Sequence, residues 1–123
     1  MSTSYTSNLK LGKPAAGDTG WGDVINGELT DMIEQAVVGM ATINTWSTNS
    51  ATLTTANGSS SEARCAILKL TDTTTDLTGA GTVIVPAATK LYGVINTTGQ
   101  TITVKTASGS GIAIKTGKQV NVV

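Results

Sequence analysis

The apolar residues of the chain change their spacing once, and this change limits the folds that the chain can adopt. From Thr19 to Trp46 they recur at intervals of three, four and seven residues, the spacing of one side of an α-helix. From Ala63 to Val123 they alternate with Thr and other polar residues, the spacing of strands that bury one face. The sequence therefore predicts an α+β protein in which a helix precedes a β-domain.

Residues 19–46 form the predicted helix, and its apolar side is wide. Thr19, or Asp18 before it, can cap the N-terminus, and acidic residues gather in the first half, where the helix dipole favours negative charge. Gly27 and Gly39 each cost about 1 kcal/mol of helix stability relative to Ala, so the helix needs packing partners. The main apolar stripe consists of Ile25, Leu29, Met32, Ala36, Ile43 and Trp46. A second, adjoining stripe consists of Ile33, Val37 and Met40.

The apolar side of this helix must be covered, and the sequence predicts no second helix that could cover it. Two arrangements meet the requirement: the helix packs on its own β-domain, or three copies of the helix form a bundle along a common axis. We favour the trimeric bundle, because three copies also cover apolar faces that a chain of 123 residues buries poorly alone. The main stripe is then the predicted trimer interface.

The second half of the chain consists of short apolar runs separated by turn residues, which is typical of strands. The last three runs alternate between aliphatic and polar residues and predict an antiparallel meander with one buried face. We therefore predict an antiparallel β-sandwich or meander over residues 63–123, after a Ser-, Asn- and Gly-rich linker over residues 47–62 that can include a short strand at 52–56. The predicted strands are 63–70, 82–85, 91–96, 101–106, 111–115 and 119–123.

Residues 1–18 are mostly small and polar, include Pro14 and show no helical period, so they form a predicted extended arm. Leu9 and Leu11 alternate with polar residues, which would let the arm add as a strand to the sheet edge of another protein. A disordered terminus is the alternative that fits the same composition.

The side chains needed for most enzyme chemistry are missing from the sequence. The chain has no His, which removes the commonest general base and the commonest metal ligand. Two carboxylate pairs, Asp31 with Glu34 and Asp72 with Asp76, fit a helix surface and a polar turn better than a catalytic site. Cys65 lies in an apolar run and is a predicted buried thiol. We therefore predict no enzymatic activity, no bound metal and no cofactor.

The charge and hydropathy of the chain also exclude several partners. The formal net charge is zero, so the chain lacks the basic field that nucleic acids require. No apolar run approaches the roughly 20 residues of a membrane span, and the N-terminus does not resemble a secretory signal. We expect neither nucleic acid nor membrane as a partner. Glycan binding has weak support, because Tyr92 is the one aromatic residue in the predicted sheet.

In the N-terminal third of the chain, a Leu-rich arm with Pro14 is followed by Gly17-Asp18, by Trp21 and then by the apolar-Asn pair Ile25-Asn26, which opens a helix. This order resembles the amino-terminal region of many phage tail-fibre and fibre-like virion proteins. The second half is similar to a β-rich module that recurs in phage fibre and adhesin proteins. The segments that carry this second resemblance are 63–70, 82–86, 90–96, 101–106 and 117–118.

This resemblance implies a homotrimer whose N-terminal arm docks on the tail, baseplate or neck of a virion. We accordingly expect a fibre base or fibre adaptor, assembled in the host cytoplasm and retained in the virion. A capsid-decorating or head-fibre protein is one alternative, and an adhesin module that binds a host-surface glycan is another. The expected virion-docking residues are Tyr5, Leu9, Leu11, Pro14 and Trp21.

Two departures from the fibre pattern qualify this expectation. Fibre proteins are usually much longer than this chain. In the β-rich module the last strand normally continues beyond the position of Val123, so we expect either a fragment of a longer protein or a strand completed by a neighbouring molecule.

Overall fold

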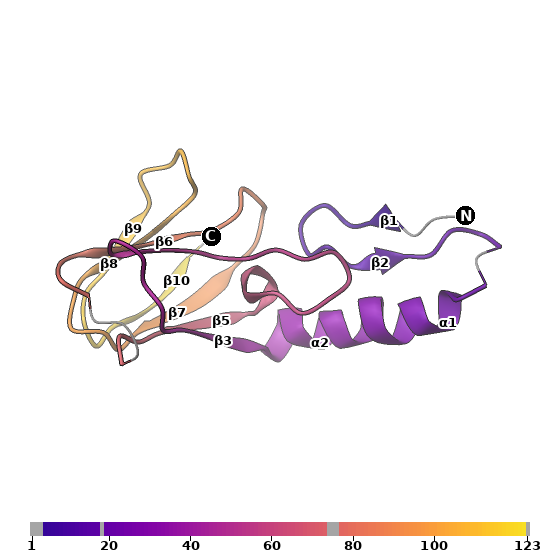
Figure 1. Cartoon of the computed structure of the whole chain (residues 1–123), viewed down its shortest axis with the longest axis horizontal. Coiled ribbons are helices and arrows are strands. Elements are labelled where there is room, and N and C mark those ends of the chain that lie inside the picture. Colours follow the sequence, from indigo (N-terminus) through magenta and orange to yellow (C-terminus); the bar gives the residue numbers. More distant parts are fainter. Residues whose placement is uncertain (1–3, 18, 74–76, 123) are drawn as a thin grey trace.

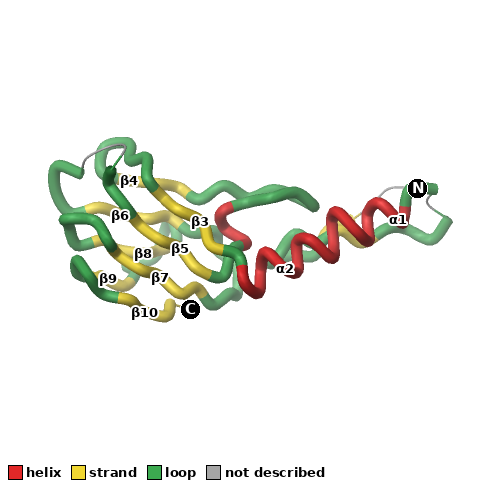
Figure 2. The backbone as a smooth tube through the Cα atoms, turned by 90° about the horizontal axis from the view of Figure 1, so that it is seen from below, coloured by secondary structure: helices red, strands yellow, loops and turns green. Residues whose placement is uncertain are grey.

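A helix of 18 residues projects from one end of a β-domain made of two sheets (Figure 1). The computed structural model describes residues 4–17, 19–73 and 77–122. Asp18, Asp76 and Val123, which entered the sequence analysis, lie outside the described residues. The two parts are arranged end to end, which gives the molecule an elongated shape (Figures 1 and 2).

The helix is continuous but changes its winding along its length. It consists of α1 (Trp21–Asp23), a π-helical stretch (Val24–Thr30) and α2 (Asp31–Val38). It begins after Gly20 without a side-chain cap, so Thr19 does not have the predicted capping role. It ends where Gly39 adopts extended backbone angles, φ −69° and ψ 142°. A Cβ atom at Gly39 would collide with the carbonyl oxygen of Gln35, so the turn out of the helix requires glycine.

The prediction that the helix reaches Trp46 is wrong. The chain enters strand β3 (Met40–Ile43) directly after Gly39. Ile43 and Trp46 are buried in the core of the β-domain, and the Trp46 indole donates a hydrogen bond to the Thr71 carbonyl oxygen at 2.7 Å. Over so few residues the apolar spacing fits either a helix or a strand and loop, and burial in the sheet core favours the strand.

Eight strands of the described residues build the β-domain as two sheets of four. The first sheet has the order β10-β7-β5-β3 and the second sheet the order β4-β6-β8-β9. From β3 to β8 the chain alternates between the two sheets, so neighbouring strands within each sheet run parallel. The remaining strands are β4 (Ser50–Thr52), β5 (Ile67–Leu70), β6 (Gly81–Ile84), β7 (Tyr92–Asn96), β8 (Ile102–Lys105), β9 (Ile112–Ile114) and β10 (Gln119–Val122).

The positions of all six predicted strands are confirmed, but their predicted antiparallel arrangement is wrong for most of them. β8 and β9 form the expected antiparallel hairpin, whereas β10 crosses to the first sheet and pairs antiparallel with β7. Alternation shows which face of a strand is buried but not the direction of its neighbour. The predicted linker over residues 47–62 contains β4 and so forms part of a crossover, which parallel pairing requires.

The core lies between the two sheets and is mainly aliphatic. The predicted inward-facing residues of the last three strands are buried or half-buried, except Ile112, which is exposed. Tyr92 and Trp46 are the aromatic members of the core. The most completely buried aliphatic side chains are Leu68, Leu70, Val83, Val94, Ile102, Val104 and Ile114.

The predicted extended arm instead folds back on its own helix as a hairpin. Strands β1 (Ser4–Tyr5) and β2 (Gly12–Lys13) pair antiparallel and lie along the helix (Figure 1). The hydroxyl of Thr6 accepts a hydrogen bond from the Leu11 N–H at 2.9 Å and stabilises the turn between the two strands. Residues 4–17 of the arm therefore contact their own chain.

One buried polar side chain joins the two sheets. Asn96 of β7 is fully buried, and its amide nitrogen donates to the carbonyl oxygens of Ile114 in β9 (2.8 Å) and Gln100 (2.9 Å). Its amide oxygen accepts hydrogen bonds from the backbone N–H (3.0 Å) and hydroxyl (2.7 Å) of Thr98. Every donor and acceptor of the amide is used, so the interaction is specific for Asn.

We predict that Asn96→Asp destabilises the fold by about 3–5 kcal/mol, because a carboxylate would face two carbonyl oxygens in a buried site. Urea unfolding followed by circular dichroism measures the change. Asn57→Asp, at an exposed position of the loop over residues 53–61, introduces the same charge and is the matched control. Equal unfolding midpoints for the two variants would contradict the proposed role of the amide.

Candidate interaction surface

The helix has a covered side, which faces its own chain, and an open side. The β1–β2 hairpin and the loop over residues 53–61 lie along the covered side (Figure 1). Gly12 of the hairpin lies so close to the helix that a Cβ atom there would approach the Glu28 Cβ to 2.6 Å. Nearer the β-domain, the Gln35 side-chain nitrogen donates to the Ser60 hydroxyl at 2.8 Å. One side of the helix is therefore covered by the hairpin and the loop of its own chain.

Arg64 connects all the segments that meet on the covered side. It is the one arginine of the chain, lies in a short 3₁₀ turn (Glu62–Arg64) before β5 and is 2% exposed. Its guanidinium donates to acceptors in the hairpin, in the loop and on the helix. The acceptors are the backbone oxygens of Leu9 (2.6 Å), Lys10 (3.3 Å), Ala56 (2.6 Å) and Ser59, the Gln35 Oε1 (3.0 Å) and the Met32 Sδ (3.0 Å).

The charge of Arg64 is stabilised by dipoles. No ion pair involves Arg64 within the described part of the chain, and its acceptors are carbonyl oxygens and a thioether sulfur. Burial lowers the pKa of Arg64, but arginine stays protonated in proteins. Each bond is charge-assisted and therefore stronger than a bond between neutral groups. The sequence analysis assigned no role to this residue, although a lone arginine within the apolar run 63–68 is a signal of such a role.

The hairpin also closes over a carboxylate. One oxygen of Glu28 is buried and has no hydrogen-bond partner among the residues that the structure describes. A Cβ atom at Gly58 would approach the Glu28 Cδ to 2.7 Å, so the loop also lies against this side chain. Burial, followed by the charge of Glu28 and a hydrogen bond to it, raises the pKa of Tyr5. The hairpin thus lies against the partly desolvated carboxylate of Glu28, and Arg64 binds the turn of the hairpin at Leu9 and Lys10.

The open side of the helix carries exposed aliphatic side chains. Val37 is 68% exposed, and Ile33, one turn earlier, and Val38 are also exposed. Met40, the first residue of β3, continues this apolar surface and is 56% exposed. These residues include the second stripe of the sequence analysis, and they form an exposed apolar cluster that the described residues of the chain do not cover. Asp31 and Glu34 are exposed on the same stretch of the helix.

The structure separates the predicted virion-docking residues into two groups. Tyr5, Leu9, Leu11 and Pro14 are half-buried in the hairpin segment, and the Leu9 carbonyl is bound by Arg64. Trp21 is 60% exposed at the start of the helix, at the end of the molecule away from the β-domain (Figure 1). Trp21 is therefore directly available to a partner, and the other four are presented on a hairpin.

The predicted trimer-interface residues are distributed over three environments. Ile25, Leu29 and Ala36 are half-buried on the helix. Met32 lies on the covered side and contacts Arg64. Ile43 and Trp46 belong to the core of the β-domain, so the prediction that they form a helical interface is wrong. The most exposed apolar residues of the helix are Val37, which belongs to the second stripe, and Val38 and Trp21, which do not.

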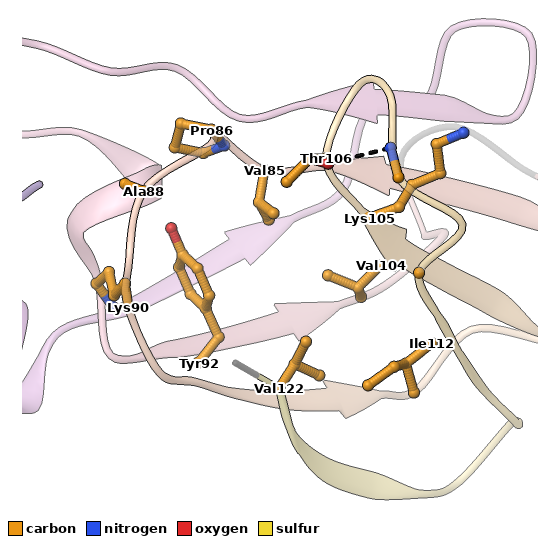
Figure 3. A pocket seen from close by; sticks show the side chains of 12 residues that line it. Val85, Pro86, Ala88, Lys90, Tyr92, Val104, Lys105, Thr106, Ile112 and Val122 are labelled. Carbon is orange, nitrogen blue, oxygen red and sulfur yellow. Dashed lines mark hydrogen bonds between the residues drawn. The ribbon is translucent and has the colours of Figure 1, made fainter.

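A cavity of about 220 Å³ opens between the two sheets (Figure 3). Its walls are mainly apolar and include Val85, Val104, Ile112 and Val122. The ring of Tyr92 also lines the cavity. The Tyr92 hydroxyl donates a hydrogen bond to the Ala63 carbonyl oxygen at 2.6 Å, and burial raises the pKa of this hydroxyl to about 12. Because Tyr92 is buried, its ring is not available for the sugar stacking considered above.

The polar groups near this cavity are already engaged. The Lys90 ammonium lies 4.0 Å from the centre of the Tyr92 ring and donates to the carbonyl oxygens of Cys65 (2.8 Å) and Leu91 (3.2 Å). Burial lowers the pKa of Lys90 and raises that of the Cys65 thiol. Cys65 is buried, as predicted, and its thiol lies 3.7 Å from the Ser61 carbonyl oxygen. These contacts stabilise the fold and place no activated nucleophile in the cavity.

Comparison with known proteins gives no relative: no family model, curated protein or solved structure matches the chain. In residues 4–17, 19–73 and 77–122, no group of three or more carboxylate, thiol or imidazole side chains is placed to hold a metal ion. None of the helices in the described ranges has the length and hydropathy of a membrane span.

We predict that Arg64→Lys destabilises the protein by about 2–4 kcal/mol, because a lysine donates from one point and cannot reach all the acceptors of the guanidinium. The hairpin should detach first, which exposes the Lys10–Leu11 bond to trypsin. Mass spectrometry of the early digest measures cleavage after Lys10, and Lys118→Arg, at an exposed position, is the control for exchanging the two bases. Unchanged protection of Lys10 would show that Arg64 does not hold the hairpin.

We also predict that Gly12→Ala loosens the hairpin, because the new methyl group would overlap Glu28 and the Val24 side chain. The expected loss of stability is about 1–3 kcal/mol, with faster cleavage after Lys10. Gly22→Ala is the matched control, since a Cβ atom at Gly22 meets no atom within 4 Å. If both alanine variants resist trypsin equally, the close packing at Gly12 has no structural role.

Proposed function

We propose that the chain is a structural subunit of a phage virion that works as a homotrimer, as a tail-fibre base or fibre adaptor. One observation carries the proposal: an 18-residue helix projects from the β-domain with an apolar side that its own chain leaves exposed. Burying an exposed Val or Ile side chain contributes about 1.5–3 kcal/mol, and three copies around one axis would bury several such side chains per chain.

The arrangement of the helical part supports a role in attachment. The start of the helix, α1 with Trp21 as its first residue, lies at the end of the molecule away from the β-domain, and the β1–β2 hairpin lies along the helix (Figure 1). Exposed Trp side chains are enriched at the centres of protein interfaces. We propose that this end docks on the tail, baseplate or neck, with Trp21 as the anchor. The hairpin residues Leu9 and Leu11 extend the proposed contact along the helix toward Arg64, which binds the Leu9 carbonyl oxygen. The β-domain then points away from the virion and begins the shaft or forms a compact head.

We predict that the purified chain has a mass of about three times 12.4 kDa by light scattering. Val37→Glu places a charge on the open side of the helix and should convert the trimer to a folded monomer, because a buried unpaired carboxylate costs several kcal/mol, roughly 3–5. Ala113→Glu introduces the same charge at an exposed position of β9 and should leave the mass unchanged. A wild-type chain that is monomeric at every concentration would refute the trimer.

A further inference from the structure

The outer faces of the two sheets differ in polarity. In the first sheet the register places Met40 opposite Ile67, and Lys69 opposite Ile95, with all four side chains outside the core. Gly93, opposite Ile67 in the next strand, adds no polar group to this face. Three large apolar side chains are therefore gathered on the outer face of the first sheet.

The outer face of the second sheet is mostly polar. Its single large aliphatic residue among the described positions of the four strands is Ile84, which is half-buried like Ile67 and Ile95. The other residues of this face are Ser50, Thr52, Thr82, Thr103, Lys105 and Ala113. Thr and Ser side chains on the solvent-exposed face of a sheet do not favour association with other apolar surfaces. The outer face of the second sheet is therefore suited to contact with water.

The apolar face of the first sheet is continuous with the open side of the helix. Gly39 joins α2 directly to β3, so Met40 follows Val37 by three residues and Val38 by two. Figure 1 shows the hairpin above the helix, and Figure 2, seen from below, looks onto the helix and the strands β3, β5, β7 and β10. The two apolar surfaces therefore lie on the same side of the molecule.

We propose that the outer face of the first sheet is an interface between copies of this chain and that it extends the helical interface onto the β-domain. The inference rests on the proposed homotrimer and assigns a further part of its contact surface. A second copy that lies parallel on the open side of the helix necessarily comes opposite this face, because both surfaces lie on one side. The partner is thus a second copy of the chain.

The size of the helix supports the same conclusion. An α-helix of this length is about 27 Å long and about 10 Å wide, so one side offers on the order of 270 Å². Stable protein interfaces bury roughly 800 Å² per partner. The open side of the helix falls short of this area, and the adjoining sheet face is the apolar surface available to extend it.

The charge of the face is compatible with contact between identical molecules. Lys69 is the one charged residue on the outer face of the first sheet among the described positions of its strands, and the uncharged polar residues of this face are Thr42, Gln119 and Asn121. A single exposed lysine can lay its aliphatic stem on the interface and keep its ammonium in water. Like charges therefore oppose self-association only weakly.

The test compares Ile67→Lys/Ile95→Lys, which adds two positive charges, with Ile84→Lys, which adds one at the equivalent depth on the second sheet; the single variant Ile67→Lys matches this control in charge. Analytical ultracentrifugation measures the concentration at which each trimer dissociates. We expect the double variant to raise this concentration about tenfold or more and Ile84→Lys to leave it unchanged. Circular dichroism of each variant verifies that the fold is retained.

A milder pair of variants gives an answer even if the double variant unfolds. Ile67→Cys and Ile84→Cys each add one thiol, and the native thiol of Cys65 is buried. Above the dissociation concentration, a maleimide reagent should label the Ile67→Cys variant several-fold more slowly than the Ile84→Cys variant, and the difference should vanish on dilution.

The outcomes separate this inference from the proposed function. If Val37→Glu dissociates the trimer while the double variant does not and the two thiols react equally, the sheet face is not an interface and the helical trimer stands. If the wild-type chain is itself monomeric, the proposed trimer fails and the inference fails with it.

Discussion

The buried guanidinium of Arg64 is the interaction on which the rest of the structure depends. It gathers the turn of the hairpin, the loop over residues 53–61 and the helix around one positive charge, with no carboxylate among its partners in the described residues. A buried charge that is stabilised only by dipoles requires several hydrogen-bond acceptors at once. If one of the three segments detaches from Arg64, the guanidinium loses acceptors and the contacts of the other two segments are destabilised. The same contacts decide which side of the helix is covered, and the apolar side opposite is left for other molecules.

The sequence was sufficient to predict the elements that depend on local pattern. The six strands after residue 63 and most of the helix follow from the spacing of their apolar residues, because burial of one face imposes that spacing. The end of the helix was mispredicted although Gly39 is visible in the sequence. A glycine within an apolar repeat is compatible with a weakened helix that continues or with the end of the helix. The close contact between Gly39 and the Gln35 carbonyl oxygen, which a side chain at position 39 would prevent, shows that the helix ends here.

The features that the sequence could not give are those set by distant contacts. Parallel pairing of β3, β5 and β7 depends on strands about 25 residues apart returning to one sheet, and strand direction leaves no trace in alternation. The hairpin was expected to be an extended arm because its contacts with Arg64 join residues more than 50 positions apart. The open surface was only partly anticipated: the stripe of Ile33, Val37 and Met40 was recognised, but the main stripe was expected to form the interface.

The alternation of strands between the sheets has a consequence for how such a protein can vary in length. Strands β3–β4, β5–β6 and β7–β8 form three successive coils, each stacked on the one before it, and β9 and β10 close the last coil with antiparallel pairs. Each coil contacts mainly its neighbours, as in other stacked architectures. A further coil inserted in the middle would therefore leave the helix at one end and the closing hairpin at the other unchanged. A protein built in this way can be lengthened in whole steps while it keeps the same means of attachment.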